Sequence, residues 1–158
     1  MKQKAPGKGL LQVVGIILVV LSVFNIIGTV INAATLSAMA GGTLDPMMES
    51  VFEQTGVTLE MFRTSVIISA VQGILYLAAG IVGIANCNKI PRANICFVFG
   101  ILMIVSVLAI QAYNVLSAPF SVLNIVGIIT GLILPLLYFW GALKNRQAMI
   151  DGQENSIL

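Results

Sequence analysis

The stretch from residue 93 to residue 143 reads ANICFVFGILMIVSVLAIQAYNVLSAPFSVLNIVGIITGLILPLLYFWGAL and contains no charged side chain. As one α-helix it would be roughly 75 Å long, whereas the hydrocarbon core of a bilayer is about 30 Å thick. The stretch is therefore long enough for two membrane crossings joined by a turn. We place this turn between Asn114 and Ser121, because Pro119 cannot continue a helix interior.

Two earlier stretches, residues 9–44 and 64–88, are also free of charge, and each suits one crossing. Continuous apolar segments favour helices, because the strands of a membrane barrel alternate in shorter pieces. We therefore predict an all-α fold, an integral membrane four-helix bundle with up-down-up-down connections, as a single transmembrane domain over residues 1–158. The four expected spans are residues 10–33, 64–86, 94–115 and 121–143.

The overall composition supports this prediction. Of the 158 residues 58% are apolar and only 9% are charged, whereas a soluble domain carries about 25% charged residues. So few charges cannot cover a water-facing surface, which excludes a soluble enzyme and a disordered chain. A nucleic-acid-binding protein is excluded as well, because it would need a basic face.

Charges in the connections predict the orientation. The expected outer loop, residues 34–63, has Arg63 as its one basic residue against four acidic ones. Basic residues favour the cytoplasmic side, so we expect a multi-pass protein of the cell membrane with both termini and the middle connection in the cytoplasm. The other basic residues are Lys2, Lys4, Lys8, Lys89, Arg92, Lys144 and Arg146.

A removable signal peptide is the alternative interpretation of the N-terminus. Three Lys precede an apolar run, and residues 38–40, Ala-Met-Ala, have the form of a cleavage site. The apolar run is longer, however, than the roughly 7–15 residues of a signal peptide. We therefore expect a retained span.

The outer loop is expected to contain a short amphipathic helix. Asp45 and Pro46 form a good helix start, and Gly56 a good stop. The helix is either a lid over the bundle end, with a solvated acidic face, or a functional element, namely a docking helix or a cation-attracting mouth. Thr58 is expected to cap the second span, with Glu60 in its first turn. The expected contact residues on the apolar side of the loop helix are Met47, Met48, Val51 and Phe52.

No expected span contains Asp, Glu, Lys, Arg or His. Proton relays and ion-coupled transport usually place an ionisable group within the membrane, and acid–base catalysis needs a side chain of suitable pKa. We therefore expect no enzyme activity, no catalytic residue, no cofactor and no metal site. Cys87 and Cys96 flank the middle connection, and we expect reduced, structural thiols there.

Uncharged polar residues recur at helical spacing within the spans, and lipid offers them no partner. We consider three interpretations: packing between the helices of one chain, a polar cavity or pore, and a surface for a partner. The residues of this polar stripe are Ser22, Asn25, Thr29, Asn32, Gln72, Tyr76, Gln111 and Asn124.

Several short motifs carry a resemblance: residues 83–85 (GIA), residues 95–96 (IC), residues 134–138 (LPLLY) and residues 141–145 (GALKN). With them the chain resembles small uncharacterised four-span membrane proteins of Gram-positive bacteria. That resemblance implies a bacterial membrane location and no particular activity. The layout is also similar to that of eukaryotic tetraspan junction proteins, but the Trp and paired Cys of their outer loop are missing here.

The functional hypothesis is a non-enzymatic integral membrane protein: a scaffold, an accessory subunit or a self-assembling tetraspan. Its expected partners are the lipid bilayer and either further copies or another membrane protein, and no nucleic acid. The alternative is an oligomeric transporter or channel for an uncharged or weakly charged solute, lined by Asn25, Asn32, Gln72 and Gln111.

Overall fold

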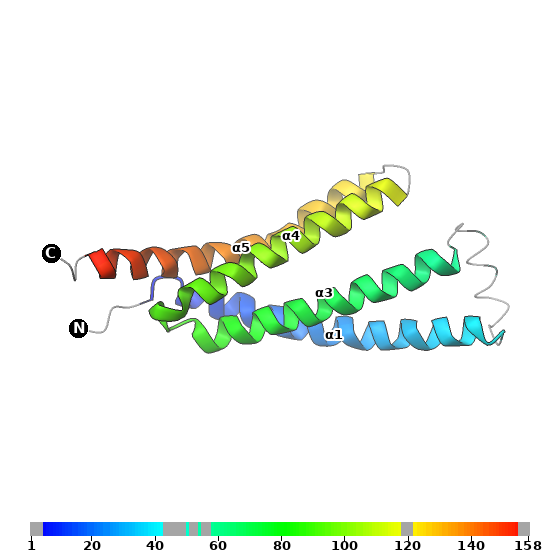
Figure 1. Cartoon of the computed structure of the whole chain (residues 1–158), viewed down its shortest axis with the longest axis horizontal. Helices are drawn as coiled ribbons and strands as arrows, with labels where there is room; N and C mark the ends of the chain where they lie inside the picture. The colour runs from blue at the N-terminus through cyan, green and yellow to red at the C-terminus, as the bar shows by residue number, and fades with distance from the viewer. Residues whose placement is uncertain (1–4, 43–49, 51–53, 55–57, 118–121, 155–158) are drawn as a thin grey trace. The chain divides into compact units, whose positions relative to one another are not determined.

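The computed structural model describes residues 5–42, 50, 54, 58–117 and 122–154. Over these residues the chain forms long helices and no strand, with one 3-10 turn, η1 (Ile90–Arg92). The long helices are α1 (Lys8–Ala40), α3 (Leu59–Asn86), α4 (Ala93–Ser117) and α5 (Val122–Glu154) (Figure 1).

Each of these four helices contains a segment that is long and apolar enough to cross a membrane. The predicted all-α architecture is confirmed, and the chain is a multi-pass integral membrane protein.

The helix ends follow local sequence signals. Thr58 caps α3 as predicted, because its Oγ1 accepts the Met61 N–H at 3.2 Å, and Glu60 lies in the first turn. At the other side of the loop α1 is followed by Gly42, which has a φ of +68°. Glycine adopts this left-handed conformation without steric cost, so it ends the helix.

All four helices extend beyond the spans expected from the sequence, and α1 and α5 extend the furthest. The first expected span, residues 10–33, lies inside α1, which continues to Ala40, and the fourth, residues 121–143, is followed by helix as far as Glu154. The spans were limited by the thickness of hydrocarbon, whereas a helix continues wherever the residues favour it. Residues 144–154 include Lys, Arg, Gln, Ala, Met and Glu, which are all good helix formers.

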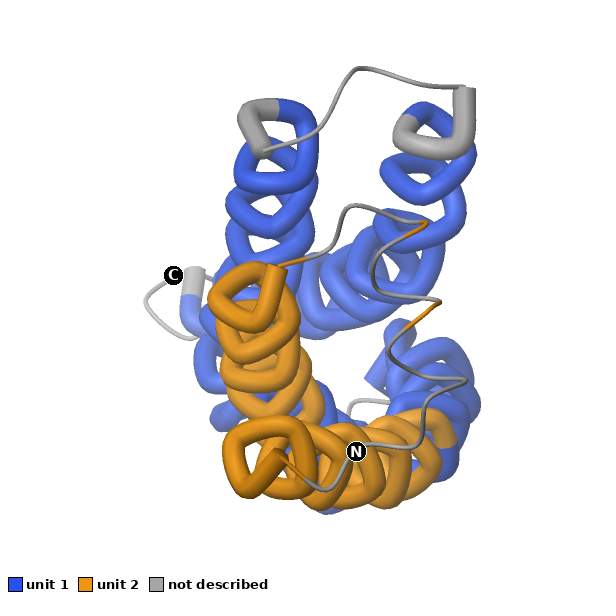
Figure 2. Tube along the Cα trace, turned by 90° about the vertical axis from the view of Figure 1, so that its right-hand side faces the viewer, with its two compact units in different colours: residues 1–20, 75–158 blue, residues 21–74 orange. Residues whose placement is uncertain are grey.

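The chain divides into two compact units, Met1–Val20 with Leu75–Leu158 (unit 1) and Leu21–Ile74 (unit 2) (Figure 2). α1 and α3 contribute residues to both units. Unit 1 therefore contains the start of α1, the end of α3 and the whole of α4 and α5, and is by itself a four-helix bundle. Its buried apolar core includes Leu11, Leu18, Ala79, Met103 and Tyr138.

Close backbone contacts bring the helices of unit 1 together. A Cβ atom added to Gly80 would lie 2.8 Å from the carbonyl oxygen of Gly15, so α1 and α3 touch through their main chains. α4 and α5 run side by side (Figure 1), and a Cβ on Gly100 would lie 3.0 Å from the Cα of Phe139. Small residues at such points are typical of helix packing in membranes.

Unit 2 consists of the end of α1 and the start of α3, with the loop between them. Within it Ser22 and Val66 are buried, and Gly73 of α3 packs against Asn25 and Ile26 of α1. Large apolar side chains cover the exposed faces of this unit; Phe24, for example, is 68% exposed. Such a surface suits contact with lipid or with another membrane protein.

Candidate functional site

One end of unit 1 is held together by a buried amide. Asn145 of α5 is completely buried. Its Oδ1 accepts the N–H of Gly7 at 2.7 Å, and its Nδ2 donates to the carbonyl oxygen of Cys87 at 3.1 Å. One side chain therefore connects the beginning of α1, the end of α3 and the later part of α5.

The neighbouring Arg146 extends this link to the fourth helix. Its Nε donates to Oδ1 of Asn94 at 3.1 Å, and its guanidinium lies over the ring of Phe97, 4.6 Å from the centroid. Because α1 and α4 begin at this end while α3 and α5 reach it with their later residues, the four helices of unit 1 run up, down, up and down.

A second buried polar group lies deeper in the same unit. Tyr138 is completely buried, and its hydroxyl donates to the carbonyl oxygen of Ala79 at 2.8 Å. Next to it Cys96 is buried with its thiol 3.9 Å from the carbonyl oxygen of Val82. These contacts satisfy polar groups inside the bundle, so they stabilise the fold.

Both cysteines are free and buried. The thiol of Cys87 lies 3.1 Å from the carbonyl oxygen of Ile84 in its own helix. Burial keeps both sulfur atoms from solvent oxidants, as expected of structural thiols.

Residues of the polar stripe have different surroundings. Ser22 is buried, while Thr29 is half-buried and donates to the carbonyl oxygen of Asn25 in its own helix at 2.9 Å. Gln72 and Tyr76 of α3 are also half-buried. Asn25 and Asn32 are exposed.

In unit 1, Gln111 of α4 lies half-buried against Gly127 of α5, where an added Cβ would be 3.2 Å from Nε2. Asn124 belongs to α5, but its side chain lies outside the described part of the structure. Gln111 therefore takes part in the packing of α4 on α5.

Asn25 is an exposed member of the polar stripe that packs against α3. Its Oδ1 faces Gly73, where an added Cβ would be 2.5 Å away, and this close approach is possible only because the residue is glycine. The side chain of Asn25 is exposed and forms no hydrogen bond with any residue that the structure describes. By sequence this amide lies about 25 Å along α1 from Lys8, within the expected hydrocarbon depth.

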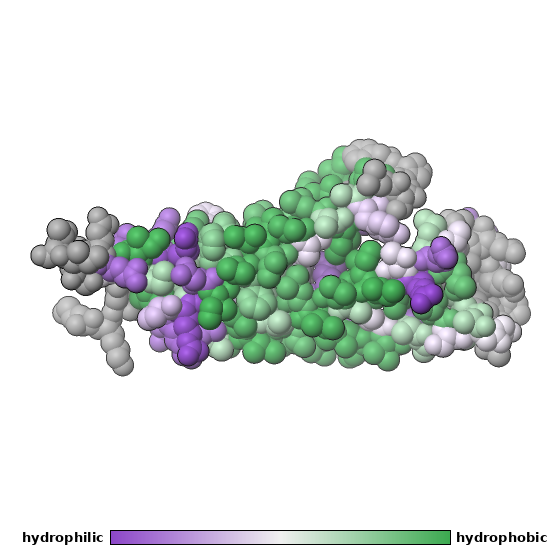
Figure 3. Space-filling model, in the orientation of Figure 1, coloured by the Kyte–Doolittle hydropathy of each residue, from purple (hydrophilic) through white to green (hydrophobic). Residues whose placement is uncertain are grey.

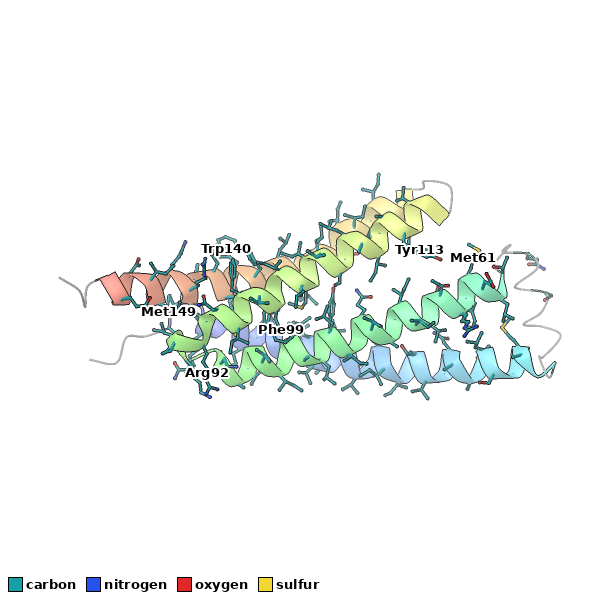
Figure 4. All side chains as sticks on the ribbon, in the orientation of Figure 1. Met61, Arg92, Phe99, Tyr113, Trp140 and Met149 are labelled. Atoms are coloured by element: carbon teal, nitrogen blue, oxygen red, sulfur yellow. The ribbon has the colours of Figure 1, made fainter. Side chains whose placement is uncertain are left out.

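Basic residues gather at the Asn145 end of unit 1, where Figure 3 shows the hydrophilic surface of this unit. Lys8, Lys89, Arg92 and Lys144 are exposed there. The only Trp of the chain, Trp140, is 57% exposed on α5 (Figure 4), and the ammonium of Lys144 lies 5.4 Å from its ring centroid.

The contact residues expected in the outer loop lie outside the described residues, so the role given to them stays a prediction. They are Met47, Met48, Val51 and Phe52. Among the described residues no three His, Cys, Asp or Glu side chains come together as a metal-binding group.

The local sequence predicts no role for Asn145, because an amide between Lys144 and Arg146 has the pattern of a solvated helix end. Its burial depends on Gly7 and Cys87, which are distant in sequence, and no local signal could have revealed it. Comparison with known proteins finds no family model, no curated protein and no solved structure that matches the chain.

Proposed function

We propose that this protein is a non-enzymatic integral membrane protein that acts by association, as a scaffold, an accessory subunit or a self-assembling tetraspan. The observation that carries this proposal is the exposed amide of Asn25, which forms no hydrogen bond with the described residues. A polar group without a partner is costly in hydrocarbon. A helix from a second chain can supply the missing partner.

The face of α1 around Asn25 suits such a helix. Asn25, Thr29 and Asn32 are spaced by four and three residues and so share one face. Asn25 and Asn32 are both exposed, about 10 Å apart along the helix. Hydrogen bonds between such amides across a membrane interface contribute about 0.5–2 kcal/mol each.

We also propose that the chain belongs to a bacterial cell membrane, with both termini in the cytoplasm. The distribution of basic residues supports this orientation, because Lys8, Lys89, Arg92 and Lys144 lie at the same end of unit 1. The resemblance to four-span proteins of Gram-positive bacteria supports the bacterial origin.

The test is the size and composition of the native particle. The full chain is extracted in a mild detergent or in lipid nanodiscs, and its mass and co-purifying proteins are measured. Asn25→Leu is expected to weaken the oligomer or complex by about tenfold, because one interface hydrogen bond is lost. Asn88→Leu is the matched control, because Asn88 is an exposed amide outside the expected spans.

A wild-type chain that is monomeric and free of stoichiometric partners would contradict the proposal. So would an Asn25→Leu variant that assembles as the wild type does. Replacing the four outer-loop residues by Ser in the same assay tests the docking helix separately. The residues to be replaced are Met47, Met48, Val51 and Phe52.

An oligomeric transporter or channel for an uncharged or weakly charged solute is the second candidate. The exposure of Asn25 and Asn32 favours it, because several copies could turn these amides towards a common passage. Vesicles containing the protein would then release such a solute, and Asn25→Leu would slow the release. Vesicles that remain tight to a panel of small solutes would exclude this function.

A further inference from the structure

An apolar groove of about 560 Å³ runs along one face of α5. Of its lining side chains, Ile133, Leu136 and Trp140 are each about half exposed. The lining is almost wholly apolar, so the groove favours hydrocarbon over water. The lining residues are Ile133, Leu136, Leu137, Phe139, Trp140 and Leu143.

The groove has the length of one bilayer leaflet. From Ile133 to Leu143 the helix rises about 15 Å, which is half of the roughly 30 Å hydrocarbon core. Trp140 lies towards the charged end of the groove, and amphipathic Trp side chains favour the depth of lipid headgroups. An acyl chain of that leaflet therefore fits along the groove.

The ammonium group of Lys144 lies at the end of the groove that is nearest to the expected lipid headgroups. Lys144 directly follows the last lining residue, and its ammonium lies 5.4 Å from the Trp140 ring centroid. Arg146, by contrast, is already engaged with Asn94 and Phe97.

No acidic residue occurs in the sequence between Arg63 and Asp151. Neither α4 nor the part of α5 before Asp151 therefore contains a carboxylate that could balance the positive charge of Lys144. Lys8, Lys89 and Arg92 add to the positive potential of the same end of unit 1.

From the apolar lining, the length of the groove and the unbalanced positive charge at its end, we propose that the groove of α5 is a binding site for an anionic glycerophospholipid. One acyl chain lies against the apolar lining, and the phosphate pairs with the ammonium of Lys144. Within a bilayer the acyl chain gains little by leaving other lipid, so the groove provides fit and position. The charge provides the preference for an anionic headgroup over a zwitterionic one.

The test uses Trp140 as its own reporter, because it is the only Trp in the chain. The full chain is reconstituted in phosphatidylcholine vesicles in which a rising fraction carries brominated acyl chains, on either phosphatidylglycerol or phosphatidylcholine. Bromine quenches a Trp that it touches, so the two quenching curves give the relative affinity of the groove for the two lipids. We expect about a fivefold preference for phosphatidylglycerol, the contribution of one basic side chain.

Two charge variants separate a site from a diffuse attraction. Lys144→Gln removes the cation at the groove and is expected to bring the preference close to one. Lys89→Gln removes an exposed cation at the same end of unit 1 that does not line the groove, and is expected to retain most of the preference. Equal loss in both variants would overturn the proposed site, and so would a wild-type chain without any preference.

A third variant tests the apolar part. Leu136→Phe narrows the groove at a half-exposed position and is expected to reduce quenching by both brominated lipids. Unchanged quenching would overturn the placement of the acyl chain. Soluble glycerophosphate is expected not to compete, and competition by it would show that a headgroup alone occupies the site, which would also overturn the proposal.

Discussion

Two asparagines of this chain show that the role of an amide side chain depends on its surroundings. Asn145 is completely buried, and both ends of its amide bind backbone groups next to the start of α1 and the end of α3. Asn25 is exposed and finds no hydrogen-bond partner among the described residues. The first therefore contributes to stability within the chain, whereas the second has its hydrogen-bonding capacity left for a neighbouring molecule.

We predict that Asn145→Leu destabilises the protein. Leu has a similar size but leaves the N–H of Gly7 and the carbonyl of Cys87 without their partner, at a cost of about 1–3 kcal/mol for each group that stays buried. The free energy of unfolding in mixed micelles with rising dodecyl sulfate measures the effect. Asn88→Leu is the control, and equal stability of the two variants would contradict the role of Asn145.

Among the helices, glycine determines how closely α1 and α3 approach. Gly15 and Gly80 face each other through their backbones, and Gly73 accommodates the side chain of Asn25. Gly28 of α1 is different, because an added Cβ would meet no atom within 4 Å. The same residue type is thus required at one position of a helix and replaceable at another.

This difference gives a paired prediction. Gly80→Ala places a methyl group 2.8 Å from the Gly15 carbonyl oxygen, and since backbone atoms cannot turn away as a side chain can, we expect a loss of about 1–3 kcal/mol. Gly28→Ala is expected to be neutral or to stabilise by up to about 1 kcal/mol, because Ala favours helix. Unfolding in mixed micelles measures both, and a loss of the same size at Gly28 would contradict the close-contact explanation.

For the whole molecule the important feature is the distribution of charge. Asn145 brings Gly7 and Cys87 together, so Lys8 and Lys89, which follow these residues closely, belong to the same end of unit 1. Arg63 stands near the start of α3, many turns before that end. The end with the larger number of basic residues is expected to face the cytoplasm, so both lysines lie on the cytoplasmic side and Arg63 lies on the outer side.

We therefore predict the labelling pattern of three single-cysteine variants in a background with Cys87→Ala and Cys96→Ala. Lys8→Cys and Lys89→Cys are expected to react with an impermeant maleimide only in inside-out vesicles, and Arg63→Cys only in intact cells. Parallel labelling after solubilisation shows that each thiol is able to react. Labelling of Lys8→Cys and Lys89→Cys from opposite sides would contradict the four-span arrangement.

The sequence alone determined the membrane setting, the four long helices and several of their ends. Long stretches without charge are compatible with hydrocarbon and not with water, and Thr58 acts on its own first turn, so these features depend on residues that are close in sequence. For the same reason the end of α4 and the start of α5 could be placed to within about two residues from Pro119 and its neighbours.

Only the tertiary structure decided which polar residues have partners and where an apolar groove lies beside a cation. Periodicity placed Ser22 and Asn25 in one stripe, yet one is buried and the other exposed. Asn145 looked like part of a solvated tail and is at the centre of a three-helix contact. Burial and hydrogen bonding of this kind depend on groups that folding brings together from distant parts of the chain, and no local pattern encodes them.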